Sequence, residues 1–416
     1  MARAAVGDET SRCIQELLAQ GVDLRRYTSV ACATDLVALV QALDDETFNL
    51  YGISCGTRLA LVTMRVYPNA GIRSVILDST YPVGLPGCER YPSEPHEVVM
   101  QIFADCHLDP VCNAACPNLQ ACFIALLAAL EAQPFVVNDE ITVTADDVAE
   151  VMQVISSAVA MAPYIPQMIA GLEAGDATTY PGIVSGELLT PASARAATPE
   201  AALPALATPD AATLVVKGEE AQAAALREVV RAFMHGIGIG DTSQALTSAL
   251  AFLSEVTFAI YQLSTGPANE LTVRLLLLDQ LPATRATLAQ FVERAFTDPV
   301  LAGEQAPLRQ IFAACKLWPG GRAPSYANLP VSSDLPTLSQ AGTYDMQAPL
   351  SWNTQAFVTF PNTGLVIAPM SGHGVLAYHQ ECITQIAGDS LDNPVSLPDD
   401  SCVAAYYPEW ALPDAT

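Results

Sequence analysis

The sequence has 416 residues, of which 51% are hydrophobic, and this is enough apolar material for a large core. Its 44 acidic and 18 basic residues give a formal charge of −26, which repels phosphate backbones and argues against nucleic-acid binding. No apolar run approaches the roughly 18 residues of a membrane helix, so we expect no membrane span.

The N-terminal part alternates helical and strand-like patterns. In chain order, the predicted elements are helix 9–20, helix 28–43, strand 48–54, helix 56–68 and strand 72–79. Thr28 or Ser29 is the expected N-cap of the second helix, because a side-chain oxygen there can accept a free N–H of the first turn. The alternation predicts an α/β fold with a parallel sheet.

The middle of the chain differs, because its pattern is almost wholly helical. The expected helices are 94–105, 118–132, 145–160, 219–235, 243–264 and 269–297, and the Ala-, Pro- and Thr-rich segment 188–216 is an expected connector. Strand-like patterns return at 334–345 and 364–369. We therefore expect a sheet core formed by residues 1–85 and 326–416, with residues 86–325 inserted between them as a large helical cap.

The motif with the clearest chemistry is Gly52-Ile53-Ser54-Cys55-Gly56, a G-x-S-x-G between a predicted strand and a predicted helix. A serine on such a tight turn is held clear of the sheet, and small residues two before and two after it let the helix pack against the strands. The motif predicts that Ser54 is a nucleophile. The simpler alternative is that Ser54 caps an ordinary helix.

A histidine and an acid follow in the order that such a nucleophile requires. His373 lies between glycines just after the strand-like segment 364–369, where an exposed loop would let its ring reach the serine. Asp345 ends the strand-like segment 334–345 and is the expected acid, with Asp334 as the alternative. The remaining histidines, which lie on predicted helices, are expected to be structural: His96, His107, His235 and His379.

These residues predict covalent acyl transfer. Ser54 would attack a carbonyl carbon, His373 would accept and return the proton, and Asp345 would orient the imidazole. The backbone N–H of Cys55 would donate to the oxyanion. No metal or cofactor is expected.

Four of the 11 cysteines lie close together, and two interpretations of them are open. They are Cys106, Cys112, Cys116 and Cys122. Zinc ligands usually come as tighter C-x2-C pairs, so disulfides are favoured over a zinc site. Cys382 and Cys402 suggest a second bridged pair. Disulfides indicate an exported protein, yet residues 1–13 contain no apolar signal-peptide core.

Several stretches resemble the α/β-hydrolase peptidase family of proline iminopeptidases and secreted tripeptidyl aminopeptidases. They are "GVDLRRYTSVACATDLVALVQAL", "FNLYGISCGTRLAL", "IRSVILDSTYPVG", "FADCHLDPVCNAACPNLQACFIALLAALEAQP", "DLPTLSQAGTYD" and "SGHGVLAYHQECI" with "SLPDDSC". The resemblance implies an α/β-hydrolase sheet with a helical cap, and a catalytic triad at Ser54, Asp345 and His373. It also implies disulfides between Cys106 and Cys112 and between Cys382 and Cys402.

The resemblance further implies what the chain acts on and where it works. Members of the family release amino-terminal residues or short peptides, and many are exported. They carry a longer N-terminal part with an H-G-G-P-G oxyanion loop, which is absent here, so we expect a sheet that is incomplete at its N-terminus and a full-length form that is secreted or in the cell envelope. Tyrosine usually follows the nucleophile, where this chain has Cys55.

Three functions are therefore open. The leading one is a serine exopeptidase that acts on peptide amino termini. The second is a carboxylesterase of the same fold, because the cap sets which acyl and leaving groups enter. The third is a truncated or inactive homologue. The expected partner is a peptide or small ester substrate.

Overall fold

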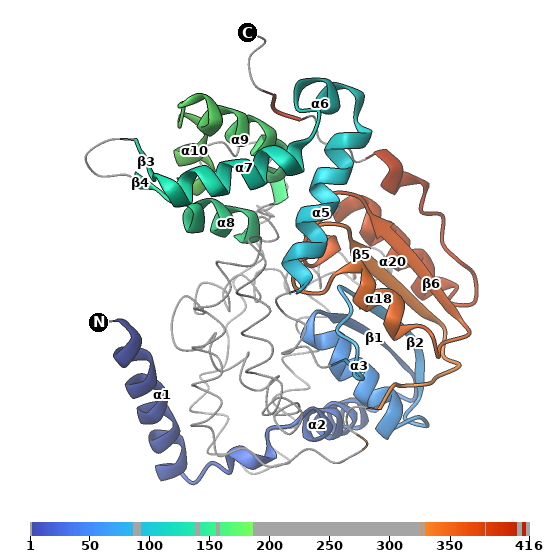
Figure 1. Cartoon of the computed structure of the whole chain (residues 1–416). Coiled ribbons are helices and arrows are strands. Elements are labelled where there is room, and N and C mark those ends of the chain that lie inside the picture. The colour runs from blue at the N-terminus through green and yellow to red at the C-terminus, as the bar shows by residue number, and fades with distance from the viewer. Residues whose placement is uncertain are drawn as a thin grey trace, which may run out of the picture.

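The computed structural model of the chain describes residues 2–85, 93–137, 142–154, 159–185, 326, 329–378, 380–405 and 410–412. Its main sheet has four parallel strands in the order β1-β2-β5-β6 (Figure 1). The strands are β1 (Phe48–Ile53), β2 (Ile72–Asp78), β5 (Thr337–Gly342) and β6 (Thr363–Ala368). The predicted parallel α/β sheet is confirmed.

The N-terminal helices are confirmed, although the first begins well before the predicted helix 9–20. They are α1 (Ala2–Ala19), α2 (Ser29–Ala42) and α3 (Cys55–Val66), with a 3₁₀ turn at Leu24–Arg26. Thr28 is the N-cap of α2, because its hydroxyl oxygen accepts a 3.2 Å hydrogen bond from the Ala31 N–H. This settles the choice between Thr28 and Ser29.

Each face of the sheet is covered by different helices. Val75 and Leu77 of β2 point to one side, where they pack in a cluster with Leu61 of α3. Ile76 points to the other side and packs with Ile383 of α20 (Gln380–Asp392). This division follows from the strand period of two, which sends neighbouring side chains to opposite faces.

The helical part begins with α5, which runs from beside the sheet toward the other helices (Figure 1). The helices of this part that the structure describes are α5 (Ser93–Leu108), α6 (Pro110–Ala115), α7 (Leu119–Ala132), α8 (Ala145–Val154), a 3₁₀ helix (Val159–Tyr164), α9 (Ile165–Ala174) and α10 (Thr179–Ser185). A short hairpin pairs β3 (Phe135–Val136) with β4 (Thr142–Val143).

The predicted helices 94–105 and 118–132 are confirmed by α5 and α7. The prediction of one α-helix over 145–160 is wrong at its end, since Val159–Tyr164 is a 3₁₀ helix that contains Pro163. Proline lacks the N–H that an α-helix would need there. The predicted elements 188–216, 219–235, 243–264 and 269–297 lie outside the described residues.

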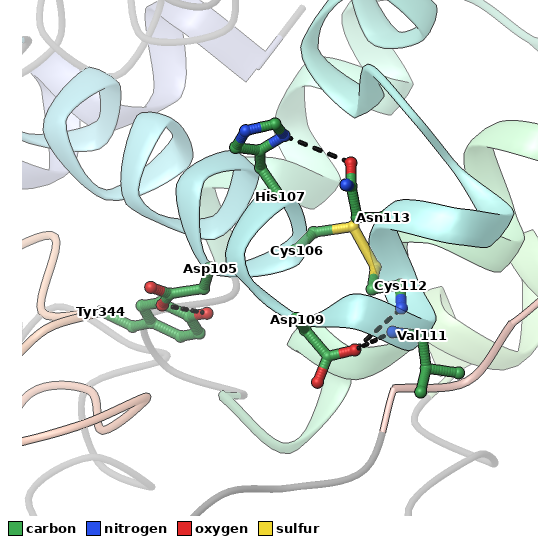
Figure 2. Close-up of a disulfide and its surroundings, with 8 residues drawn as sticks. All are labelled: Asp105, Cys106, His107, Asp109, Val111, Cys112, Asn113 and Tyr344. Atoms are coloured by element: carbon green, nitrogen blue, oxygen red, sulfur yellow. Dashed lines mark hydrogen bonds between the residues drawn. A yellow bond between two sulfur atoms is a disulfide. The ribbon is translucent and has the colours of Figure 1, made fainter.

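The helical part packs against the loops that follow β5 and β6. Its apolar cluster includes Tyr344, Met346 and Met370 from those loops. The Tyr344 hydroxyl also donates a 2.8 Å hydrogen bond to Oδ2 of Asp105 on α5 (Figure 2). These contacts place the helices beside the carboxyl ends of the strands, which is where α/β enzymes bind their ligands.

The described residues contain two disulfides, with the pairings that the family resemblance implies. Cys106–Cys112 joins α5 to α6 (Figure 2), and Cys382–Cys402 joins α20 to a 3₁₀ helix at Ser401–Ala405. Cys106 and Cys112 are therefore not free thiolates, which sets aside the zinc alternative for that cluster. Within the described ranges, no helix is long and apolar enough to cross a bilayer.

Candidate active site

Backbone strain gathers at the carboxyl edge of the sheet. Among the described residues, four that are not glycine have a positive φ, and three of them follow strands: Ser54 after β1, Ser79 after β2 and Met370 after β6. Such conformations cost free energy and persist where the surrounding structure enforces them, often at functional sites. This edge is therefore the first place to look for an active site.

Ser54 occupies the sharp turn between β1 and α3. Its φ of 56° and ψ of −122° lie outside the regions that ordinary residues prefer, as a nucleophile elbow requires. Its side chain makes no capping hydrogen bond to α3, so the structure does not support the helix-cap alternative. The Ser54 N–H donates to the Asp78 carbonyl oxygen at 3.0 Å, which fixes the turn to the neighbouring strand.

The two glycines of the motif do different things. A Cβ atom on Gly52 would lie 2.6 Å from the carbonyl carbon of Gly56, closer than real side chains approach, so residue 52 must be glycine. A Cβ atom on Gly56 would meet nothing within 4 Å among the described residues. Among the described residues, nothing therefore requires glycine itself at position 56, and the expectation of a small residue there is not tested further.

Asp345 and His373 form a buried pair at the same edge. Nδ1 of His373 lies 2.9 Å from Oδ1 and 3.0 Å from Oδ2 of Asp345. The Asp345 side chain is fully buried, whereas the His373 side chain is 16% exposed. The acid can thus orient the imidazole and leave its second nitrogen free to act on another group.

The loop after β5 holds the Asp345 carboxylate in place. Its Oδ1 accepts backbone N–H groups of Gln347 and Ala348, each at 2.9 Å. Burial by itself would raise the pKa of Asp345, but the His373 charge and hydrogen bonds from His373, the Ala348 N–H and Ser79 lower it overall. Asp334 is exposed and precedes β5 at the other end of the strand, so it is not the partner of His373.

The His373 ring is more basic than an ordinary histidine. Burial alone would lower its pKa, but the Asp345 carboxylate raises it overall by its charge and hydrogen bond, and the Asp78 charge adds to this effect. The pair therefore stabilises an imidazolium, which is the form that a general base takes after it accepts a proton.

The residues that adjoin Ser54 and His373 in sequence lie close together, which places Ser54 near the acid–histidine pair. A Cβ atom on Gly374, the residue after His373, would lie 3.6 Å from Cγ2 of Ile53, the residue before Ser54. Within the described part of the chain, the Ser54 hydroxyl makes no hydrogen bond to His373. Catalytic hydrogen bonds are often long in enzymes without substrate, so the geometry is compatible with a serine and base pair.

Cys55 begins α3, where the first N–H groups of the helix have no intrahelical acceptor. Its own N–H is therefore a candidate donor to a substrate oxyanion. Burial raises the pKa of the Cys55 thiol, and backbone hydrogen bonds only partly offset this. The thiol therefore stays protonated at neutral pH, the form that is not nucleophilic.

Sequence reasoning missed Asp78 and Ser79, which also lie at this edge. Both are fully buried at the end of β2. The signal in the sequence was an aspartate that ends an otherwise apolar strand, "IRSVILDS". His107, by contrast, is exposed on α5 and contacts Asn113 at 3.2 Å, as expected for a structural histidine (Figure 2).

A serine at a strand-to-helix elbow, an acid after a later parallel strand and a histidine after the next strand define the α/β-hydrolase class. Residues 299–402, which include Asp345 and His373, match the family model described as TAP-like protein. This part of the chain is therefore similar to TAP-like proteins.

The other comparisons add little to this similarity. No curated protein matches the chain. Among solved structures, one similar chain is a thermophilic esterase from Thermogutta terrifontis, with 14% identity over 89% of this chain and 74% of that chain and a TM-score of 0.29. A TM-score this low does not define a common fold, so the class rests on the sheet, the edge geometry and the family model.

Proposed function

We propose that this protein is a serine hydrolase in which Ser54 is the nucleophile, His373 the general base and Asp345 the acid that orients it. The observation that carries the proposal is the buried hydrogen bond between His373 and Asp345, located beside the strained elbow of Ser54. All three residues follow the carboxyl ends of parallel strands, where one bound substrate could reach them together.

The reaction would proceed through an acyl-enzyme. The Ser54 oxygen attacks a carbonyl carbon while Nε2 of His373 accepts the hydroxyl proton, and the imidazolium then gives that proton to the leaving amine or alcohol. In the second half of the reaction, water attacks the acyl carbon, again with His373 as the base. This releases the carboxylic acid product and restores the Ser54 hydroxyl. The triad is regenerated in each cycle, and one water molecule is consumed.

The developing oxyanion would be stabilised by the start of α3. The Cys55 N–H lies in the first turn, where unpaired backbone donors and the helix dipole favour negative charge. A backbone donor does not depend on the side chain, so the replacement of the usual tyrosine by Cys55 leaves this contribution intact.

The preferred substrate is a peptide with a free amino terminus. The family description, tripeptidyl aminopeptidase-like, supports this choice. The formal charge of −26 also favours the approach of a positively charged terminal amine over that of an anionic substrate. The two disulfides support an exported protein, in the cell envelope or outside the cell.

A fluorophosphonate probe tests the nucleophile directly, because it reacts with activated serines. Labelling of the wild-type protein, lost in Ser54→Ala and strongly reduced in His373→Ala, is the expected result. Circular dichroism of both variants ensures that they are folded. A folded wild-type protein that remains unlabelled would mean an inactive homologue and would overturn the proposal.

Paired substrates test the specificity. Tripeptide p-nitroanilides with a free amino terminus should be cleaved, and the same peptides with an acetylated terminus should be cleaved far more slowly. The p-nitrophenyl esters of short acids are the comparison. Hydrolysis of the esters without hydrolysis of either peptide would replace the exopeptidase with a carboxylesterase of the same fold.

A further inference from the structure

Asp78 is a second buried carboxylate at the candidate active site, and the reaction described above does not use it. It ends β2, is fully buried, and shares its sheet face with Ile76, which packs toward α20. Its Oδ1 accepts the Val375 N–H at 2.9 Å and its Oδ2 accepts the Leu376 N–H at 3.2 Å. These are the first residues after the His373-Gly374 dipeptide.

Ser79 completes this contact one residue later. Its hydroxyl oxygen accepts the Gly374 N–H at 2.8 Å, and its hydroxyl proton can be donated to Oδ1 of Asp78 at 3.3 Å. The same proton can instead be donated to Asp345, which lowers the pKa of that carboxyl. The side chains of Asp78 and Ser79 thus accept the three successive backbone N–H groups that follow His373. Ser79 makes its contact from a strained backbone conformation, with a φ of 56°.

Asp78 also contacts the nucleophile through its backbone. Its carbonyl oxygen accepts the Ser54 N–H at 3.0 Å, while its carboxylate holds the segment behind His373. The positions of Ser54 and His373 therefore both depend on this one residue. An ordinary strand end would leave its aspartate in solvent, so a buried carboxylate with these partners needs an explanation.

We propose that Asp78 is a positioning residue of the hydrolase: its carboxylate fixes the backbone that carries His373, and its negative charge supports the protonated imidazole. The inference rests on the proposed function for its effect on catalysis. Its effect on the ionisation of His373 is a separate property, which a measurement on the protein without substrate can detect.

The charged and titratable groups around Asp78 come from three elements. Tyr51 of β1 donates its hydroxyl to Oδ2 at 3.4 Å, Asp345 follows β5, and His373 follows β6. Burial raises the pKa of Asp78 to about 6, although the Val375 and Leu376 N–H groups and the His373 charge oppose this rise, while the Asp345 charge adds to it. Asp78 is ionised at neutral pH, when the general base is needed, and loses its charge in mildly acidic solution.

Asp78→Asn is the main test, because it removes the charge and keeps the shape. The pKa of His373, followed by NMR of the labelled imidazole and assigned with His373→Gln, should fall by roughly one pH unit. The kcat for the best substrate should fall by roughly tenfold to a hundredfold with KM changed by less than about threefold, since positioning rather than binding is lost. The acidic limb of kcat/KM should move to lower pH together with the His373 pKa.

Asp399→Asn is the matched control. Asp399 is an exposed carboxylate whose Oδ1 accepts the Ser401 N–H at 2.9 Å, so it makes a similar contact at the start of a 3₁₀ helix away from the active site. Neither the His373 pKa nor the pH profile should change in this variant. A folded Asp78→Asn protein that behaves like Asp399→Asn would overturn the inference.

Two measurements keep the inference testable if Asp78→Asn does not fold. In the wild-type protein, the His373 resonance should show a second step near the pKa of Asp78, because neighbouring groups titrate as a coupled pair; a single step would count against it. Ser79→Ala removes the acceptor for Gly374 and keeps the negative charges of Asp78 and Asp345, so kcat should fall without the fall in His373 pKa that Asp78→Asn causes. If the wild-type protein neither reacts with the probe nor hydrolyses any substrate, the proposed function fails, and the NMR titrations still decide whether Asp78 acts on His373.

Discussion

A hydrogen bond between the Tyr344 hydroxyl and the Asp105 carboxylate joins the loop after β5 to helix α5, directly beside the candidate acid Asp345. Tyr344 precedes Asp345 in the loop after β5 and is fully buried, and its hydroxyl donates to Asp105 Oδ2 at 2.8 Å. Oδ1 of Asp105 accepts a hydrogen bond of 2.8 Å from the Gln101 side-chain amide, so both carboxylate oxygens have a donor. The helical part is thus bonded to the loop that places the acid.

Tyr344→Phe should lower stability by about 1.5–3 kcal/mol, because the hydrogen bond that it removes ends on a charged group. A double-mutant cycle with Asp105→Asn should give a coupling energy of about 1 kcal/mol or more in chemical denaturation. We also expect a lower kcat in Tyr344→Phe, since Asp345 is the next residue. Additive effects of the two substitutions would show that the contact does not connect the two parts.

The glycines of the elbow give a second prediction with an internal control. Gly52→Ala places a Cβ atom 2.6 Å from the Gly56 backbone, which cannot move as a flexible side chain could. We expect a loss of about 3 kcal/mol or more and weaker labelling of Ser54, because the turn must open. Gly56→Ala has free space within α3 and should be neutral or stabilising by about 0.5–1 kcal/mol. Equal melting temperatures of the two variants would contradict this assignment.

The elbow and the acid–histidine pair could be predicted because their signals are local. A strand, a G-x-S-x-G and a helix lie within about 20 residues of one another. Asp345 and His373 each follow a short apolar strand in the order that the chemistry needs. The structure joins those two residues, and the catalytic role of all three stays a prediction.

The remainder of the site could not be predicted, because it depends on which strands become neighbours. Asp78 reaches Val375 across 297 positions of sequence, and it does so because β2 is central between β1 and β5. The strand order is a tertiary property that no local pattern contains. The G-x-S-x-G motif has a glycine on each side of the serine. The sequence alone does not show that, of the two, Gly52 is the one whose Cβ position is blocked by the backbone of α3.

The pH dependence of activity follows from the Asp345–His373 pair. The pKa of His373 is raised above its ordinary value of 6.5, so the acidic limb of kcat/KM should lie above pH 6.5. Asp345→Asn should move this limb to lower pH and reduce kcat by roughly 10⁴-fold, because it removes both the charge and the correct tautomer. A limb that stays in place in the variant would show that another group is the base.

The same pair should affect stability in a defined pH range. The Asp345 contribution is present above pH 3.8 and is lost as the pH falls through its lowered pKa, while the His373 contribution is present below pH 6.5 and is lost as the pH rises through its raised pKa. The stability difference between the wild-type protein and Asp345→Asn should therefore be largest between those values. Urea denaturation at several pH values measures it.

The two disulfides should differ in what they contribute. Cys106 and Cys112 are separated by 6 positions, and Cys382 and Cys402 by 20. The longer loop loses more entropy in the unfolded chain, so replacing the second pair by serines should cost about 1 kcal/mol more than replacing the first. Chemical denaturation of the two double variants compares them. The opposite order would show that packing of the buried Cys106 and Cys112 outweighs loop closure.

The last prediction separates the functional cost of Asp78 from its structural one. The pKa of Asp78 in the folded protein, about 6, lies above the ordinary value of 3.8. Ionisation of Asp78 therefore destabilises the folded protein relative to the unfolded chain. A difference of about two pH units corresponds to a loss of roughly 3 kcal/mol in the free energy of unfolding. This loss is absent below pH 3.8, grows as the pH rises and is complete above about pH 6. Asp78→Asn mimics the neutral form.

Asp78→Asn should therefore melt about 2–4 °C above the wild-type protein at pH 8 and only about 1 °C above it at pH 4.5, where the side chain of the folded wild-type protein is largely protonated. Calorimetry at the two pH values measures this difference. A variant that is more stable and yet less active at pH 8 is the expected behaviour of a residue retained for function at a cost in stability. If the variant is instead less stable at both pH values, the hydrogen bonds to Val375 and Leu376 outweigh the buried charge, and Asp78 stabilises the fold itself.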